Sequence, residues 1–214
     1  KINMIEKNNL NSVNASYVIG RFSKKIGNKF QHFPIDNWQK EIIIAKKFNF
    51  DGVEWIISDF SNPIFNEIYL NNIKNLLKKK KIKMCSISLD LIMENPLHSI
   101  SKKNLEWLIN KLNFIQKQIP IKRISVPIEE KARYRNQKQK KTSLNKLYLI
   151  LKKLSSKSKI CIETDIAPKK LREIFKEKRM KKLGLLVDIG NVRANGFKIN
   201  EYINFFCDKI FGIH

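Results

Sequence analysis

Three residues of types that bind divalent metals each stand at the end of a short apolar segment. Glu163 lies in KICIET (159–164), Asp188 ends LGLLVD (183–188) and His214 ends KIFGIH (209–214), at intervals of 25 and 26 residues. Two carboxylates and one imidazole form an oxygen–nitrogen ligand set that suits Mn²⁺, Mg²⁺ or Co²⁺, with Zn²⁺ as the alternative. The competing interpretation is that Glu163 caps a helix and His214 stands there by chance, and spacing alone does not decide between the two.

The segments that carry these residues belong to a set of seven apolar runs rich in β-branched residues. Near-continuous hydrophobicity is typical of strands covered on both faces, as in a parallel sheet. The set consists of SYVIGRF, GVEWII, KMCSISLD, KRISVPI, KICIET, LGLLVD and KIFGIH.

Helical periodicity appears between these runs. In the first helix Asp36 is the expected N-cap, and Gln39 three residues later completes a capping box. Strand followed by helix, repeated, is the βα pattern. The expected helices are at 36–49 and at about 66–80, 101–118, 141–156, 168–179 and 199–208.

The number of βα repeats predicts the fold. Six and a half repeats favour an α/β chain folded as a (β/α)₈ TIM barrel over a doubly wound sheet, although periodicity alone does not distinguish them. Such a barrel typically takes about 250 residues. We therefore expect residues 1–214 to form one TIM-barrel domain that is truncated at the C-terminus, with strands one to seven present and the last helix and strand missing. In a barrel the carboxyl ends of the strands share one rim, which would bring Glu163, Asp188 and His214 together.

The charge of the chain is strongly positive. Lys and Arg number 43 against 19 Asp and Glu, giving a net charge of +24, which raises the prospect of a nucleic-acid partner. Only 7 of the basic residues are Arg, the side chain best suited to bidentate phosphate binding. We therefore interpret the lysine-rich runs 76–83 and 131–141 as solvated helix ends and loops, and do not favour nucleic acid as a partner.

The apolar segments and the cysteines of the sequence indicate where in the cell the protein is expected. The sequence has no apolar stretch of about 18 residues that would predict a membrane span, and residues 1–16 lack the apolar block of a secretory signal. Cys85, Cys161 and Cys207 are odd in number and widely spaced. They are interpreted as reduced and buried, which predicts a cytoplasmic protein.

Several motifs together resemble the xylose-isomerase-like TIM-barrel superfamily of sugar and sugar-phosphate isomerases and epimerases. The resemblance covers the chain from about residue 15 to its end, and includes a Gly-Arg on the first strand followed by a Phe-Pro-x-Asp-Asn-Trp helix start. The motifs that carry it are GRFSKKIGNKFQHFPIDNWQKE, FDGVEWI, IETDIAP, VDIGNVRANGF and DKIFGIH.

The resemblance implies a single divalent metal held by Glu, Asp, His and a second Glu on successive strands. Glu163, Asp188 and His214 match the first three ligands, and the fourth would lie beyond residue 214. The implied reaction moves a proton α to a carbonyl through an enediolate whose charge the metal holds, with Glu163 as both catalytic base and ligand. Because the fourth ligand is also half of the family's acid–base pair, residues 1–214 alone are expected to be inactive.

Candidate substrate-binding residues stand at other strand ends. Arg21 could bind a substrate phosphate or carboxylate through two hydrogen bonds, or form a salt bridge at the rim. Glu54 could accept a hydrogen bond from a sugar hydroxyl, with Trp55 beside it as an apolar wall. Asp90 and Glu94 follow the third strand, and one of these two acids is interpreted as structural.

The segment DIGNVRANG supplies the remaining candidates, Asn191 and Arg193, between Gly190 and Gly196. Asn191 could reach a substrate hydroxyl or only cap the turn, and Gly190 would let the backbone turn close to the metal. His32 and His98 are interpreted as surface residues.

Rival functions remain on the same barrel. The apurinic-site endonucleases require three zinc ions held by several histidines, but this sequence has 3 histidines and Asn191 where an Asp-x-x-His pair would end. We therefore disfavour that activity. A non-catalytic sugar-binding barrel and a metal-dependent dehydratase or hydrolase stay open.

The expected partner is a small sugar or sugar phosphate in carbohydrate metabolism, and the resemblance leaves open a homo-oligomer.

Overall fold

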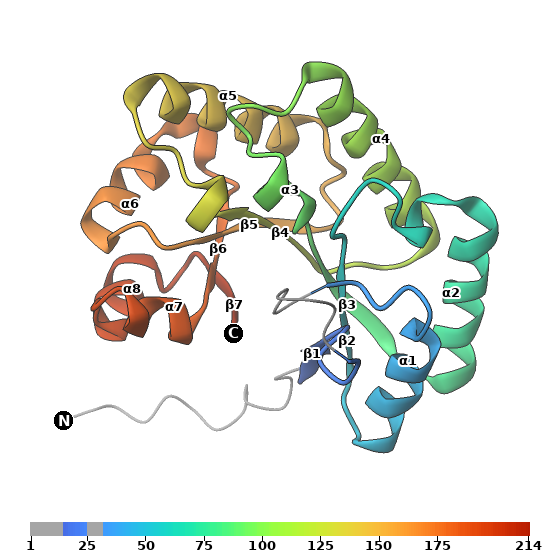
Figure 1. Cartoon of the computed structure of the whole chain (residues 1–214). Coiled ribbons are helices and arrows are strands. Elements are labelled where there is room, and N and C mark those ends of the chain that lie inside the picture. The colour runs from blue at the N-terminus through green and yellow to red at the C-terminus, as the bar shows by residue number, and fades with distance from the viewer. Residues whose placement is uncertain (1–14, 25–31) are drawn as a thin grey trace.

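A curled sheet of seven parallel strands forms the centre of the molecule (Figure 1). The computed structural model describes residues 15–24 and 32–214. Each strand is hydrogen-bonded to the next in chain order, from β1 to β7. The strands are β1 (Ser16–Val18), β2 (Gly52–Ile56), β3 (Lys83–Ser88), β4 (Arg123–Ile128), β5 (Lys159–Thr164), β6 (Gly184–Val187) and β7 (Ile210–Ile213).

Helices cover the outer, convex side of this sheet (Figure 1). Asn66, Ser101 and Asn136 each accept a hydrogen bond from the first turn of the helix that follows, as expected of N-cap side chains. The α-helices are α1 (Trp38–Lys47), α2 (Glu67–Lys80), α3 (Leu91–Glu94), α4 (Lys102–Gln118), α5 (Gln137–Lys153), α6 (Pro168–Lys176), α7 (Ile189–Ala194) and α8 (Ile199–Phe206). The described residues also form the 3₁₀ turns η2 (Pro63–Phe65), η3 (Glu130–Ala132) and η4 (Lys178–Met180).

This arrangement confirms the TIM-barrel prediction, and all seven apolar segments form strands. The six expected helices are also present, although α5 begins at Gln137 rather than at 141. The predicted capping box is wrong, because Asn37 is the N-cap of α1 and makes no side-chain cap hydrogen bond. Two short helices were not predicted: α3 and α7 each begin within a few residues of the end of a strand.

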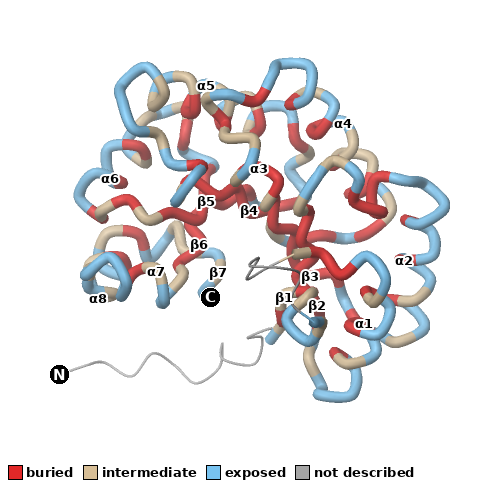
Figure 2. Tube along the Cα trace, viewed as in Figure 1, coloured by how far each residue is buried: buried red, intermediate tan, exposed pale blue. Residues whose placement is uncertain are grey.

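The two faces of the sheet have different compositions. Val53, Trp55 and Ile87 belong to the core that packs between the strands and the helices, and Figure 2 shows buried residues along the strands. Residues at the alternate positions face the interior of the curl, because side chains alternate along a strand. Several of these are polar yet buried, including Glu54 and Ser86. The interior therefore carries charge as well as apolar volume.

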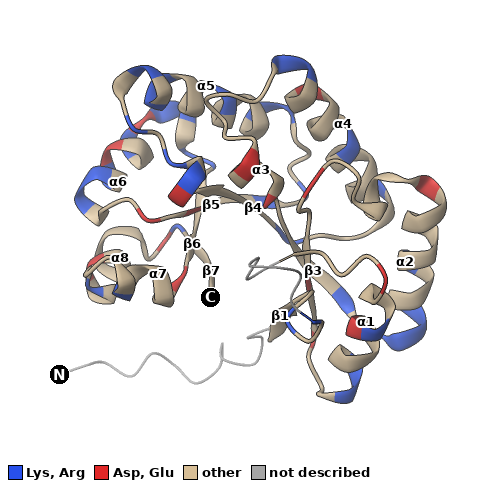
Figure 3. Cartoon of the chain, in the orientation of Figure 1, with Lys and Arg blue, Asp and Glu red and all other residues tan. Residues whose placement is uncertain are grey.

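Surface features are consistent with a solvated exterior. Lys and Arg lie over the outer helices (Figure 3), and Lys78, Lys79 and Lys80 form the basic last turn of α2. No helix within residues 15–24 and 32–214 is both long and apolar enough to cross a membrane. The prediction that there is no secretory signal concerns residues 1–16 and falls mostly outside the described part of the chain, as do residues 25–31 of the first resemblance motif.

The cysteines agree with the prediction only in part. Cys85 and Cys161 are buried free thiols, but Cys207 is free and exposed. The prediction that Cys207 is buried is wrong because this residue follows the last turn of α8 and does not face the core.

Candidate metal centre

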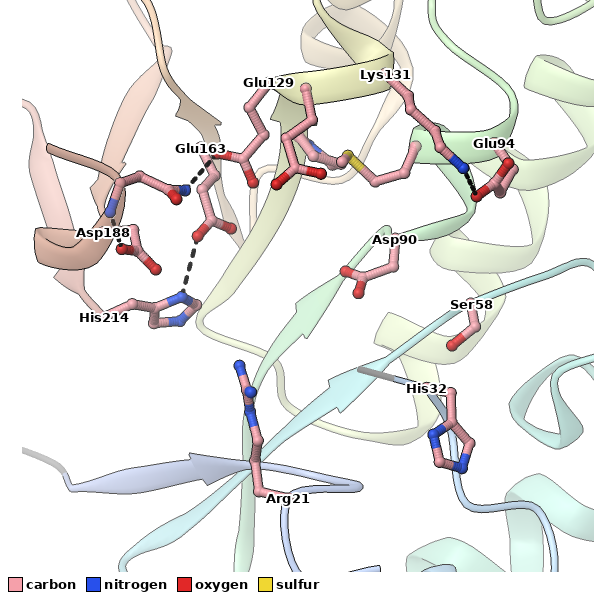
Figure 4. Close-up of a pocket in the computed structure, with 14 residues that line it drawn as sticks. Arg21, His32, Ser58, Asp90, Glu94, Glu129, Lys131, Glu163, Asp188 and His214 are labelled. Carbon is pink, nitrogen blue, oxygen red and sulfur yellow. Dashed lines mark hydrogen bonds and ion pairs between the residues drawn. The ribbon is translucent and has the colours of Figure 1, made fainter. Parts of the chain in front are cut away.

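Glu163, Asp188 and His214 come together at the carboxyl ends of β5, β6 and β7. Each residue offers one ligand atom, and the three atoms lie within 4.8 Å of one another. Nδ1 of His214 is 3.2 Å from Oε1 of Glu163 (Figure 4). The donor set therefore fits a single divalent cation, because carboxylate oxygens and an imidazole nitrogen are ordinary ligands for such ions.

Backbone structure fixes two of these side chains. Asp188 is the N-cap of α7, and its Oδ1 accepts a hydrogen bond of 2.7 Å from the amide of Asn191. His214 is paired with β6 through its amide, which donates to the carbonyl of Val187 at 2.8 Å, while its own carbonyl accepts from Ile189 at 3.0 Å. The site is therefore built into the sheet and the first turn of a helix.

The charge state of His214 reflects the surrounding carboxylates. Burial by itself lowers the pKa of the imidazole, but Glu163 and Glu54 outweigh that effect and raise the pKa to about 10. Without a metal the ring is therefore a cation near neutral pH. A positive charge is favoured at this position whether a proton or a metal provides it.

A cavity of about 520 Å³ opens beside the three ligands. Arg21, Asp90 and Asn191, three of the predicted substrate-binding residues, line it. In Figure 4 Arg21 points into the cavity from the side opposite Glu163. Other lining residues include His32, which was interpreted as a surface residue, together with Ser58, Glu94, Glu129, Glu130 and Lys131.

Glu129 is the main cavity residue that the sequence interpretation missed. Burial, followed by the charges of Glu163, Asp165 and Asp188, raises the pKa of its carboxyl to about 8. The side-chain amide of Asn191 donates to its Oε2 at 2.7 Å. The signal in the sequence is the pair of acids, Glu129 and Glu130, directly after the apolar run KRISVPI. A buried carboxyl that keeps its proton near neutral pH is a candidate general acid.

The structure does not bring the other three predicted residues to the cavity. The Trp55 side chain is fully buried on the helix side of β2, where its ring centroid is 4.8 Å from that of Phe33. Glu54 lies on the opposite face, buried beneath His214, so neighbours in a strand could not both line the site. Arg193 is exposed on α7 and lies outside the cavity lining.

Two further residues belong to the DIGNVRANG segment. Asn191 lines the cavity, and its side-chain amide contacts Glu129. Gly190 lies within α7, and a Cβ there would sit 3.0 Å from Oδ1 of Asp188. Its lack of a side chain thus leaves room for the carboxylate.

The chain has the fold of the xylose-isomerase-like TIM barrels, as comparison with solved structures shows. D-Psicose 3-epimerase from Clostridium cellulolyticum H10, solved with D-tagatose, has a TM-score of 0.69 and 14% identity, over 93% of this chain and 72% of the epimerase. No family model matches the sequence, and neither does any curated protein.

Two other structures show the range of functions found on this fold. The probable 3-DHS dehydratase AsbF from Bacillus anthracis has a TM-score of 0.66 and 15% identity, over 93% of this chain and 72% of that one. An AP endonuclease of family 2 from Brucella melitensis has a TM-score of 0.69 and 9% identity, over 94% and 78%. At these identities the likeness establishes the fold and leaves the reaction to be argued from the site.

Proposed function

We propose that the protein is a divalent-metal-dependent isomerase or epimerase that acts on a small sugar by moving a proton α to a carbonyl. The observation that carries this proposal is the approach of the Glu163, Asp188 and His214 ligand atoms to within 4.8 Å beside a cavity. The epimerase of the same fold supports it. When bound, the cation would stabilise negative charge developing on the oxygen atoms of the sugar.

Side chains of the cavity supply the proton transfers. Glu163 is the proposed base, because its carboxylate is held at the end of β5 and faces the cavity. Glu129 is the proposed acid, since its raised pKa of about 8 keeps a proton on the carboxyl at neutral pH. Each well-positioned group of this kind contributes about 10²–10⁴-fold to the rate.

The charges that line the cavity favour an unphosphorylated substrate. Asp and Glu contribute 6 of the lining residues, whereas Arg21 and Lys131 are the Lys or Arg side chains among them. Lys131 is already paired with Glu94 at 2.9 Å (Figure 4). A phosphate dianion would meet repulsion from these carboxylates, whereas the hydroxyl groups of a neutral sugar can donate hydrogen bonds to them.

The test is the exchange of solvent deuterium into a ketose. With Mn²⁺, the full-length wild-type protein should label the carbon next to the carbonyl of a ketohexose, detected by mass spectrometry or NMR. Incorporation of deuterium needs only the base that removes the proton, so it does not depend on a second acid. Glu163→Gln should reduce the exchange at least 10²-fold.

An exposed carboxylate provides the control for this test. Glu173→Gln on α6 should leave the exchange unchanged, because Glu173 lies outside the cavity lining. Exchange that persists in Glu163→Gln would reject the role given to Glu163. Sugar binding without any exchange in the wild type would favour the non-catalytic barrel.

Dehydration is the second candidate, and Glu129 is the observation that favours it. A base that removes the α proton and an acid that protonates the departing hydroxyl are the two groups that loss of water requires. Glu163 and Glu129 could act as this pair. The dehydratase of the same fold supports the alternative. The two reactions are distinguished by the product, because dehydration removes one water whereas isomerisation and epimerisation conserve mass.

A further inference from the structure

Glu54 lies directly beneath the metal centre although it does not line the cavity. Its Oε1 is 3.2 Å from Nε2 of His214, and its side chain is only 2% exposed. Oε1 makes no hydrogen bond within the described part of the chain. Nε2 of His214 is therefore the polar partner of this buried oxygen, and a buried carboxylate is costly unless such a partner stabilises its charge.

The other oxygen of Glu54 is firmly held. Nη2 of Arg123 lies 2.7 Å from Oε2, and the hydroxyl of Ser86 donates to the same oxygen. Arg123 extends from β4 across the interior, and its Nη1 donates to the carbonyl of Phe211 at 3.3 Å. The carboxylate is therefore fixed by groups from β3 and β4, and the guanidinium that fixes it is itself anchored to β7.

Space for this arrangement is provided by Gly212, two residues before His214. A Cβ at Gly212 would lie 1.7 Å from Nη1 of Arg123, so any side chain there would displace the guanidinium. The contacts thus form a continuous series through the interior, from Arg123 to Glu54 to His214 and then to Glu163.

The two ring nitrogens of His214 therefore have different neighbours. Nδ1 lies 3.2 Å from Oε1 of Glu163, and Nε2 lies 3.2 Å from Oε1 of Glu54. In metal sites a histidine ligand usually donates its second ring N–H to a carboxylate, which fixes the tautomer and the ring orientation.

We propose that Glu54 is a positioning residue that keeps the proton of His214 on Nε2, so that Nδ1 is the nitrogen that binds the divalent cation. This inference rests on the metal site of the proposed function. It gives Glu54 a role behind the metal site in place of the predicted contact with substrate, and it assigns the buried ion pair of Arg123 and Glu54 a role in metal binding. Loss of such a partner typically lowers metal affinity about 10–100-fold.

The first test needs no variant. The wild-type protein is loaded with Zn²⁺ as a diamagnetic probe, and the histidine rings are observed by long-range ¹H–¹⁵N NMR, with His32→Gln and His98→Gln used to assign the signals. The expected result is a zinc-bound Nδ1 and a protonated Nε2 for His214. Zinc on Nε2 would overturn the inference while leaving the metal site in place.

The second test compares two buried glutamates by titration with Mn²⁺. Glu54→Gln should bind the ion about 10–100-fold more weakly than the wild type. Glu41→Gln is the matched control, since Glu41 is 1% exposed and its Oε1 accepts a hydrogen bond of 2.6 Å from Ser23, away from the cavity lining. Equal affinity of Glu54→Gln and the wild type would overturn the inference.

Failure of the proposed function would look different. If the wild-type protein bound neither Zn²⁺ nor Mn²⁺, the metal site itself would be rejected, and the role of Glu54 with it. If it bound both and exchanged no deuterium, the catalytic proposal would fail, whereas the NMR and affinity results would still decide the role of Glu54.

Discussion

Glu129 shows how the surroundings of one carboxyl group control its proton. Its pKa is raised to about 8 from the usual 4.5, first by burial and then by neighbouring carboxylates. Between these two values the folded state holds a proton that the unfolded state has lost. The free energy of unfolding must therefore fall as the pH rises through this window.

The corresponding prediction concerns metal-free protein. Glu129→Gln removes the titrating group, so its free energy of unfolding should fall less than that of the wild type between pH 5 and pH 8, by about 1–3 kcal/mol. Urea denaturation with EDTA at pH 5, 7 and 8.5 measures this. Glu173→Gln, which alters an exposed residue, should follow the wild type, and parallel curves for Glu129→Gln would contradict the assignment.

His214 leads to a prediction about metal binding. The pKa of its imidazole is about 10 in the metal-free protein, because the two glutamates outweigh the effect of burial. A histidine must be neutral to bind a metal, so Mn²⁺ should displace about one proton at pH 7.5, with a further fraction from Glu129. Calorimetry in buffers of different ionisation enthalpy counts these protons. Binding without proton release would exclude His214 as a ligand.

Some relationships between residues were beyond prediction from the sequence. Glu54 and Arg123 are 69 residues apart, and nothing in either segment indicates that they form an ion pair. The proximity of Glu163, Asp188 and His214 could be predicted because each stands at a strand end, and parallel strands bring such ends together. Trp55 was misplaced because adjacent residues of a strand point to opposite faces.

At the scale of elements, strands were easier to predict than the short helices at the rim. Each strand appears as an apolar run because the sheet is covered on the outside by helices and is filled on the inside. Helix α7 has six residues and includes Gly190, so the sequence resembled a loop. Its helical state depends on the Asp188 cap, which the sequence suggested only as a metal ligand.

The double role of Asp188 leads to a prediction for α7. Gly190→Ala should raise the free energy of unfolding by up to about 1 kcal/mol, since alanine favours a helix more than glycine does. The added Cβ would lie 3.0 Å from Oδ1 of Asp188, so Mn²⁺ should bind several-fold more weakly. Chemical denaturation and metal titration measure the two effects.

Ala194→Gly at the exposed end of the same helix is the matched control. This substitution should lower the free energy of unfolding and leave the affinity for Mn²⁺ unchanged. Ala194 lies at the opposite end of α7 from the Asp188 carboxylate. If Gly190→Ala bound Mn²⁺ as well as the wild type, Gly190 would have no role in positioning that carboxylate.

For the whole molecule, the net charge and the charge of the cavity have opposite signs. The chain carries +24, and many Lys and Arg of the described part lie over the outer helices (Figure 3), whereas acids dominate the cavity lining. Composition alone would therefore mislead about the ligand, because the sum of charges describes the exterior and not the site.

Arg123 on β4 also connects distant parts of the molecule, because it contacts both β2 and β7. Gly212→Ala should lower the free energy of unfolding by about 1–3 kcal/mol, because the new Cβ overlaps the guanidinium. In an Arg123→Met background the same substitution should cost less. Urea denaturation of the four proteins gives the coupling energy, and additive effects would show that the two residues do not interact.

The contact of Arg123 with the Phe211 carbonyl links the proposed metal site to the strand that precedes His214. His214 lies on the same terminal segment as that carbonyl, so local detachment of β7 would remove a metal ligand and deprive a buried guanidinium of an acceptor in a single event. A bound cation would then stabilise the attachment of this strand to the sheet. Removal of the proposed cation would therefore weaken the attachment of β7 to the sheet.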